Sequence, residues 1–208
     1  IDNPDRGFSY KTNGPLDLRM NPEKGITAAQ RLRTIEPEEL EGMLIENSDE
    51  PYAGEISRAV TAELKSGNKI ETTGQLRNVI DKALNFLPAA EKKEAVKKSC
   101  QRTFQALRIA VNHELDALEE GLDTIFAHIA PGGRLCVITF HSLEDRLVKN
   151  KFRRWSTACT CPPEFPVCVC GGKAKAKLIT RKPIEANTQE LEENRRSRSA
   201  HLRVLEKC

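Results

Sequence analysis

The stretch of sequence that decides the fold is PGGRLCVITFHSLEDR, residues 131–146. The Pro-Gly-Gly at 131–133 predicts a turn that ends the helical pattern before it. Residues 134–140 form a short apolar run, which is typical of a strand covered on both faces in an α/β sheet. His141 and Ser142 follow at the carboxyl end of this strand, where open α/β sheets bind ligands. The stretch therefore predicts an α/β junction that faces a ligand.

A helix is expected directly after this strand, over about 143–154. Ser142 is suited to cap it, with Asp145 three residues on in a variant of the capping box. Among the four histidines, only His141 lies at a strand end that favours catalysis or ligand contact. His113 and His128 are interpreted as surface or hydrogen-bonded positions of the helical stretch before it, and His201 lies in the last predicted strand.

The bulk composition excludes a membrane-spanning protein. The chain has 208 residues, which suits one large domain or two small ones. No apolar run approaches the length of a membrane span, and the first residues lack the pattern of a secretory signal. Seven cysteines, an odd number, without such a signal indicate reduced thiols in a cytoplasmic protein.

Positive charge is concentrated in the last part of the chain. Residues 146–208 contain 15 Lys and Arg against 6 Asp and Glu, whereas the net charge of the whole chain is only +3. Such a region is a candidate surface for a polyanion, and a solvated charged face is the alternative. Within it, Asn194 precedes the run RRSRSA, residues 195–200. Its arginines either contact phosphates or form a charged turn before the last strand.

The first 25 residues are rich in Gly, Pro, Asn and Asp and predict an irregular loop. Within it, GPLDLRM at 14–20 carries Asp17 and Arg19. This pair is either functional, as residues of such loops often are, or a local ion pair.

Helical patterns dominate the middle of the chain. Residues 26–100 show no strand-like alternation and predict a small helical subdomain. A long helical stretch over 103–129 follows, with Gly121 as the expected bend or break. Further strands are expected at 177–180 and 200–206.

A cluster of cysteines interrupts the C-terminal part. Cys159, Cys161, Cys168 and Cys170 form two CxC pairs. Four thiolates suit a structural zinc, although CxxC is the usual spacing. Reduced cysteines in a loop are the alternative.

Four segments together resemble one family. DRGFSYKTNGPLDLRMNP, CQRTFQALRIAVNHELDALEEGL, APGGRLCVITFHSLEDRLVK and ENRRSRSAHLRVLEK are similar to the S-adenosylmethionine-dependent 16S ribosomal RNA (cytosine-N4) methyltransferases of the MraW/RsmH type. The resemblance spans nearly the whole chain in the same order. It implies methyl transfer from S-adenosylmethionine to the N4 amine of a cytidine in the decoding region of the small ribosomal subunit.

The resemblance also implies a fold. We expect part of a class I methyltransferase sheet, which is Rossmann-like, with an inserted helical subdomain. Residues 1–25 then form an active-site loop, 26–100 the inserted subdomain, and 101–208 the C-terminal half of the methyltransferase domain.

One family feature is missing. Family members begin with strands and a Gly-rich cofactor loop of the type DGTFGxGGHS, and no such loop occurs here. The chain is therefore interpreted as truncated at its N-terminus. The class I strand order is 3-2-1-4-5-7-6, and this chain supplies only strands 5, 6 and 7. We therefore expect the edge of the strand at 134–140 to be unpaired within the chain.

Position and resemblance together give the candidate site residues. The catalytic or pocket-lining candidates are His141, Ser142, Glu144 and Asp145. A loop closing over cofactor or base is expected to contain Asp17, Arg19 and Met20. RNA contacts are expected from Arg146, Asn194, Arg196 and Arg198. Two alternatives stay open, namely a non-catalytic RNA-binding module with a four-cysteine metal site and an inactive fragment.

Overall fold

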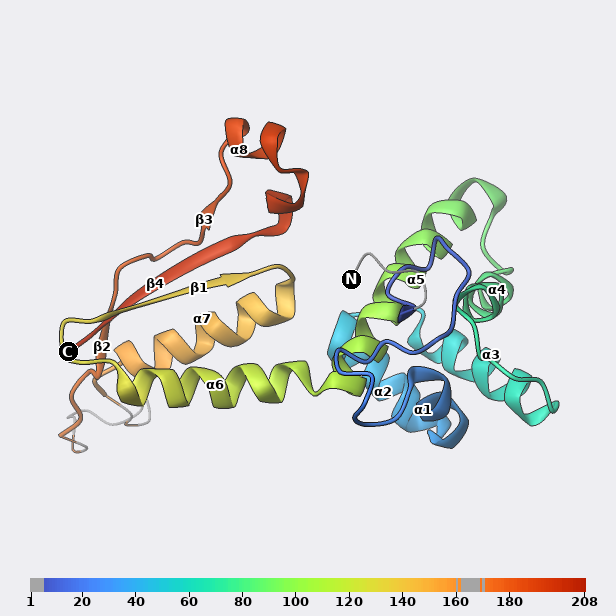
Figure 1. Cartoon of the computed structure of the whole chain (residues 1–208), viewed down its shortest axis with the longest axis horizontal. Coiled ribbons are helices and arrows are strands. Elements are labelled where there is room, and N and C mark those ends of the chain that lie inside the picture. Colours follow the sequence, from blue (N-terminus) through green and yellow to red (C-terminus); the bar gives the residue numbers. More distant parts are fainter. Residues whose placement is uncertain (1–5, 160, 162–168, 170) are drawn as a thin grey trace. The chain divides into compact units, whose positions relative to one another are not determined.

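The structure is a computed structural model that describes residues 6–159, 161, 169 and 171–208. It divides into two compact units, Ile1–Glu114 and Leu115–Cys208. Figure 1 shows a helical first unit and a second unit built on strands. Across the described ranges, none of the helices combines the length and apolar character needed to cross a membrane.

The first unit is helical, as the sequence predicts. Capping boxes start α1 and α4, in which Thr27 pairs with Gln30 and Thr72 with Gln75. Its core also buries two leucines of the preceding loop, Leu16 and Leu18. The helices are α1 (Ala28–Thr34), α2 (Pro37–Ser48), α3 (Ala53–Lys65), α4 (Thr73–Ala83) and α5 (Ala89–Asn112).

The long helical stretch breaks at a different place from the one expected. Helix α5 runs without interruption through residue 100, where the sequence placed a domain boundary, and ends at Asn112. His113 then adopts a left-handed conformation with φ of 51°, and α6 (Glu114–His128) begins at the next residue. The expected break at Gly121 is wrong, because this half-buried glycine lies within α6. The helical stretch is interrupted at His113 instead.

The second unit contains a small antiparallel sheet. Its strands are β1 (Arg134–Thr139), β2 (Ala176–Leu178), β3 (Ile184–Glu185) and β4 (His201–Lys207). The strand order is β1-β4-β2, and β3 also pairs with β4. All three pairings are antiparallel, and β1 pairs with β4 from Arg134 opposite Glu206 to Thr139 opposite His201. The remaining elements are α7 (Ser142–Ser156), α8 (Thr188–Glu193) and the 3-10 helix η2 (Arg195–Ser199).

Helices α6 and α7 lie on the same side of this sheet (Figure 1). Leu135 and Leu205, which are opposite each other in the β1–β4 pair, face them. The rings of Phe126 and Trp155 stack between the two helices, with centroids 4.1 Å apart. The core is completed by Leu122, Val148, Phe152 and Ala176. These contacts fix α7, and so fix the residues at its first turn.

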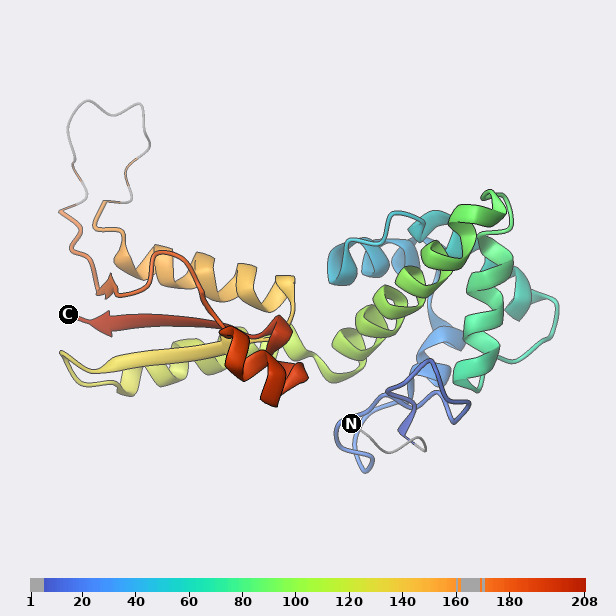
Figure 2. The same cartoon turned by 90° about the horizontal axis from the view of Figure 1, so that it is seen from above.

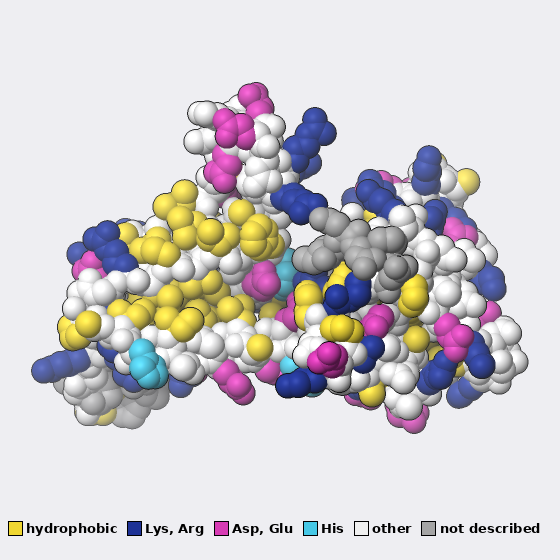
Figure 3. All heavy atoms as spheres, in the orientation of Figure 1, with side chains coloured by type: hydrophobic (Ala, Val, Ile, Leu, Met, Phe, Trp, Pro, Cys, Tyr) yellow, Lys and Arg dark blue, Asp and Glu magenta, His cyan; other side chains and the backbone are white. Residues whose placement is uncertain are grey.

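The other side of the sheet and one edge of β1 are uncovered. Ile138 and Phe140 are 58% and 57% exposed, and Figure 3 shows hydrophobic side chains gathered over the strands of this unit. In the part of the chain that the structure describes, β1 pairs with β4 alone. The prediction of an unpaired edge is therefore confirmed. The order β1-β4-β2 is the one that the resemblance predicts for strands 5, 7 and 6, and the class I sheet itself stays a prediction.

Candidate functional site

The carboxyl end of β1 leads directly into a helix cap. His141 is extended, and its Nδ1 accepts a hydrogen bond from the Glu144 N–H at 3.4 Å. In return, Glu144 Oε2 accepts from the N–H groups of Phe140 and His141, at 2.8 and 3.2 Å. The predicted cap of Ser142 with Asp145 is therefore wrong by one residue. The helix begins at Ser142, and its exposed hydroxyl is not used to cap it.

The cap fixes the hydrogen-bonding role of each nitrogen of His141 and lowers the pKa of Glu144. Because Nδ1 of His141 accepts a hydrogen bond, the neutral ring carries its proton on Nε2, which lies 3.3 Å from Glu144 Oε1. Burial alone raises the pKa of Glu144, but the hydrogen bonds from His141 and Phe140 outweigh it and hold the pKa below its ordinary value. Glu144 is therefore a carboxylate at neutral pH, and its main contacts hold the start of α7.

Asp145 points in another direction and pairs with the last strand. Its two carboxylate oxygens accept from Nε and Nη2 of Arg203, both at 2.7 Å. The side chains of Arg203 and Asp145 are only 8% and 15% exposed. The Arg203 guanidinium holds the pKa of Asp145 below its usual range. This bidentate pair joins α7 to β4 across 58 residues of sequence.

His201 also belongs to this cluster, although sequence reasoning assigned it no role. Its Nδ1 lies 3.7 Å from Asp145 Oδ1, and its Nε2 lies 3.8 Å from Glu185 Oε1. His201 lies opposite Thr139 in the sheet, next to the β1 end. We name Asp145, Glu185, His201 and Arg203 the strand-end cluster. The role of His201 follows from the antiparallel pairing of β1 with β4, which the sequence pattern did not indicate.

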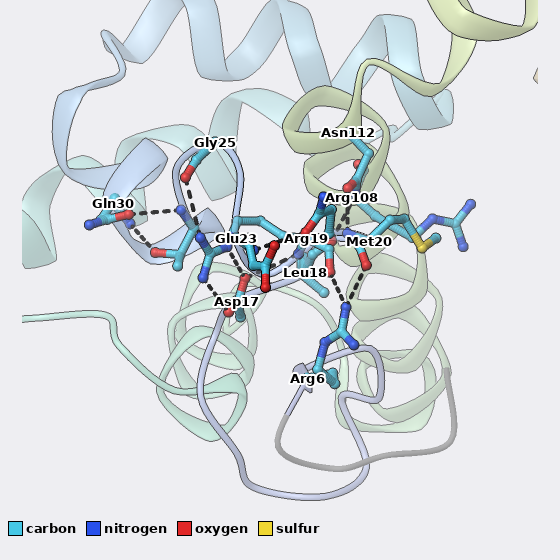
Figure 4. A network of polar contacts seen from close by, with 12 residues as sticks. Arg6, Asp17, Leu18, Arg19, Met20, Glu23, Gly25, Gln30, Arg108 and Asn112 are labelled. Atoms are coloured by element: carbon cyan, nitrogen blue, oxygen red, sulfur yellow. Dashed lines mark hydrogen bonds and ion pairs between the residues drawn. The ribbon is translucent and has the colours of Figure 1, made fainter.

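The loop at 14–20 forms a second polar network, in the first unit (Figure 4). Arg19 donates to both oxygens of Asp17, from Nε at 2.7 Å and from Nη2 at 2.9 Å. These hydrogen bonds lower the pKa of Asp17. The local ion pair that the sequence left open is therefore present. Met20 follows with its side chain exposed.

The main chain of this loop is held from two sides. Leu18 is buried with φ of 64°, a conformation that few residues other than glycine adopt. Asn112, at the end of α5, donates to Leu18 O at 2.7 Å and accepts from Met20 N–H at 2.6 Å. Arg6 donates to the carbonyl oxygens of Arg19 and Met20, at 2.6 and 2.8 Å. Sequence reasoning missed both residues, because their partners are distant in the sequence. Asn112 and Met20 are 92 residues apart, and Arg6 is 13 and 14 residues from its two partners.

The conformation of this loop also depends on Gly7, and this dependence can be tested. Gly7 has φ of +72°, and a Cβ there would lie 2.3 Å from the backbone oxygen of Pro15. We expect Gly7→Ala to reduce the free energy of unfolding by about 2 kcal/mol, measured by urea unfolding with circular dichroism. Gly42→Ala is the control, because Gly42 lies in α2 with open space around it. An unchanged G7A midpoint would contradict the close approach.

The predicted RNA contacts lie on exposed surfaces of the second unit. Arg146 is on the first turns of α7. Asn194 caps η2 by accepting from the Arg196 N–H at 3.1 Å. Arg196 and Arg198 are exposed on η2, directly before β4 begins at His201. The 3-10 helix therefore directly precedes the strand that carries His201 and Arg203 of the strand-end cluster.

Comparison with known proteins identifies the group to which these segments belong. A family model described as the MraW methylase family matches residues 1–208. The chain belongs to the MraW methylase family. This confirms the resemblance drawn from the four sequence segments.

Named relatives of this MraW-family chain agree with the match. Ribosomal RNA small subunit methyltransferase H 1 of Lachnoclostridium phytofermentans is 60% identical over 158 residues, which is 76% of this chain and 43% of the relative. Methyltransferase H 2 of Agathobacter rectalis is 44% identical over 208 residues, covering all of this chain and 65% of the relative. Methyltransferase H of Carboxydothermus hydrogenoformans is 46% identical over 207 residues, covering 100% of this chain and 65% of the relative. The chain thus spans less than two thirds of the length of these relatives.

Membership of a methyltransferase family implies the use of S-adenosylmethionine. The loop residues that were expected to contact this cofactor already have partners within the chain. Both carboxylate oxygens of Asp17 already accept from Arg19. The N–H of Met20 donates to Asn112, and its carbonyl accepts from Arg6. The polar groups of this loop are thus used within the chain. These contacts fix the shape of the loop, and we assign no reaction step to its residues.

The predicted zinc site falls partly outside the described residues. Cys168 and Cys170 are not among them, whereas Cys159 is exposed and Cys161 half-buried. Within the described ranges, no group of three or more His, Cys, Asp or Glu side chains is arranged to hold a metal ion. The described part of the MraW-family chain therefore gives no support to structural zinc.

Proposed function

We propose that this chain forms the acceptor side of an enzyme that methylates the N4 amine of a cytidine in 16S ribosomal RNA. The observation that carries the proposal is the family match over residues 1–208. The strand-end cluster lies where an α/β sheet binds its substrate, which supports the same assignment. In this reaction S-adenosylmethionine supplies the methyl group.

The strand-end cluster has groups suited to hold a cytosine amine. A cytosine N4 carries two N–H donors, and carboxylates are acceptors for exocyclic amines. The lowered pKa of Asp145 keeps it ionised and acceptor-only at neutral pH. We propose that Asp145 and the exposed Ser142 hydroxyl orient the amine, while His141 and Glu144 fix the helix start beneath them. A displaced base held in this way would be positioned for methyl transfer.

The other expected roles follow from this proposal. The loop with Asp17, Arg19 and Met20 closes over the cofactor or the base. Arg146, Asn194, Arg196 and Arg198 contact the RNA backbone. The partner is the small ribosomal subunit, and the setting is the cytoplasm.

A chimera tests the proposal, because the relatives are longer than this chain. The matching segment of the Carboxydothermus hydrogenoformans relative, 46% identical over 207 residues, is replaced with residues 1–208 of this chain. The chimera is incubated with S-adenosylmethionine and small subunits that lack the modification. We expect N4-methylcytidine in the digested RNA, detected by mass spectrometry. Asp145→Asn should lower the rate at least tenfold, about 1.4 kcal/mol in activation free energy, because it removes the carboxylate.

Glu193→Gln, an exposed carboxylate on α8, is the matched control and should leave the rate unchanged. A folded chimera that binds S-adenosylmethionine but forms no N4-methylcytidine would contradict the proposal. Methylation at another cytidine atom would contradict the N4 assignment.

A further inference from the structure

The stretch of sequence from Arg146 to Lys182 has a large excess of positive charge. This stretch contains ten Lys and Arg residues and one acidic residue, Glu164, which is outside the described part of the chain. Lys151 is neutralised by Glu119 and Asp123, each 2.7 Å from its Nζ. Eight other cations are exposed and form no ion pair with any described residue: Lys149, Arg153, Arg154, Lys173, Lys175, Lys177, Arg181 and Lys182.

The helix dipole explains only part of this charge. Arg153 and Arg154 lie in the last turn of α7, where cations favourably face the carbonyl end of a helix. The backbone of Lys175 also lies at this helix end, where its N–H donates to Trp155 O, whereas Lys177 lies in β2 and Arg181 and Lys182 follow it. Like charges held along one segment repel one another, so an external polyanion stabilises this arrangement.

The cations after residue 172 follow a fixed path. The Lys175 N–H donates to Trp155 O at 2.8 Å, which ties the segment to the end of α7. From there β2 pairs with β4 from Ala176 opposite Lys207, and β3 pairs with its other end at Glu185 opposite His201. Figure 2 shows this segment running beside β4. The seven residues of β4 span about 20 Å.

We name Lys173, Lys175, Lys177, Arg181 and Lys182 the basic track. Ala176 and Leu178 turn toward the core of the unit, whereas Lys175 and Lys177, which alternate with them along the chain, are exposed. The track begins beside the end of α7 and stops at Lys182, two residues before β3, in which Glu185 lies opposite His201. His201 lies 3.7 Å from Asp145. The track therefore lies between the end of α7 and the strand-end cluster.

We propose that the basic track binds the phosphates of an RNA strand that continues from the candidate site. The choice of RNA over other polyanions rests on the proposed function. Lysines act as point charges toward phosphates and read no base. The track therefore supplies affinity and direction, while the strand-end cluster selects the base.

Binding of an RNA without cytidine tests the track separately from methylation. The probe is a dye-labelled 20-nucleotide oligoadenylate, whose anisotropy is followed with the 208-residue chain over a range of KCl concentrations. The variant is Lys175→Gln/Lys177→Gln/Arg181→Gln. The slope of log K against log salt is negative, and each lost phosphate contact reduces its magnitude by about 0.7 for single strands. We expect the magnitude of the slope to fall by about 2, and the affinity to fall at least tenfold at low salt.

The matched control removes the same number and kind of exposed charges from the first unit, as Lys65→Gln/Lys93→Gln/Arg77→Gln. It should bind within twofold of the unchanged chain. If circular dichroism shows that the triple track variant misfolds, Lys173→Gln/Lys182→Gln outside the strands should still reduce the magnitude of the slope by about 1.4. An unchanged slope in the folded variant overturns the proposal, as does tighter binding to phosphatidylglycerol vesicles than to RNA. A chimera that fails to methylate while oligoadenylate binding persists contradicts only the proposed function.

Discussion

Replacing Arg203 with methionine should reduce the free energy of unfolding of the second unit by about 3–4 kcal/mol at pH 7. The substitution leaves the Asp145 carboxylate mostly buried without the guanidinium that now binds both of its oxygens. Amide hydrogen exchange along β4 measures the loss, because Arg203 lies in the middle of that strand. We expect faster exchange there and little change in the first unit.

The effect should depend on pH in a defined direction. The pKa of Asp145 is lowered in the folded chain, so its ionised form stabilises the fold above the unfolded pKa, near 4. That stability is lost as the pH falls through the lowered folded pKa. In R203M the pKa rises, because burial then acts without the cation. The difference between the two proteins should therefore be largest at neutral pH and shrink as the pH falls below about 4.

Asp145→Leu/Arg203→Met is the informative control. Removing both charges avoids a buried unpaired ion, so this variant should be more stable than R203M alone. An R203M chain with unchanged exchange along β4 at pH 7 would show that the pair contributes no stability.

Replacing Asn112 with aspartate should destabilise the first unit by about 3 kcal/mol. The change keeps the acceptor for the Met20 N–H but removes the donor that now binds Leu18 O and Arg108 O, at 2.7 and 2.8 Å. A carboxylate oxygen then faces two carbonyl oxygens. Exchange of the Met20 amide measures the release of the loop. In the chimera, the KM for S-adenosylmethionine should rise if the loop closes over the cofactor.

Asn85→Asp is the matched control. Asn85 Oδ1 accepts from Lys92 Nζ at 2.7 Å, and aspartate preserves that contact. The same isosteric change should therefore leave stability unchanged or raise it slightly. The loss of unfolding free energy in N112D should become smaller at acidic pH, because protonation of the new aspartate restores a hydrogen-bond donor. Equal stability of N112D and N85D at neutral pH would contradict the role of Asn112 in holding the loop.

The sequence predicted those parts of the molecule that depend on local pattern. The strand at 134–140, the turn before it and the helix after it all form, and the helical first unit matches its periodicity. The unpaired edge of β1 followed from the family strand order. The cap was misplaced by one residue because serine and aspartate are commoner caps than histidine. Only the reciprocal contact between His141 and Glu144 settles it.

The parts that could not be predicted depend on contacts between distant residues. In the sequence, Arg203 is one of many cations in a basic region, and its pattern indicates an exposed residue. In the structure, the pairing of β4 with β1 buries it against Asp145. Asn112 reads as the end of a helix, and its two contacts with Leu18 and Met20 become visible only in three dimensions. The break at His113 depends on a left-handed residue that no pattern marks.

The stacking of Trp155 on Phe126 has a practical consequence. Trp155 is the one tryptophan of the chain and lies in the core of the second unit, whereas both tyrosines, Tyr10 and Tyr52, belong to the first. Tyr10 and Tyr52 pack edge-on against Phe104 and Phe86. Intrinsic tryptophan emission therefore reports the melting of the sheet-containing unit, and tyrosine signals report that of the helical unit. One unlabelled sample thus separates two unfolding transitions that circular dichroism adds together.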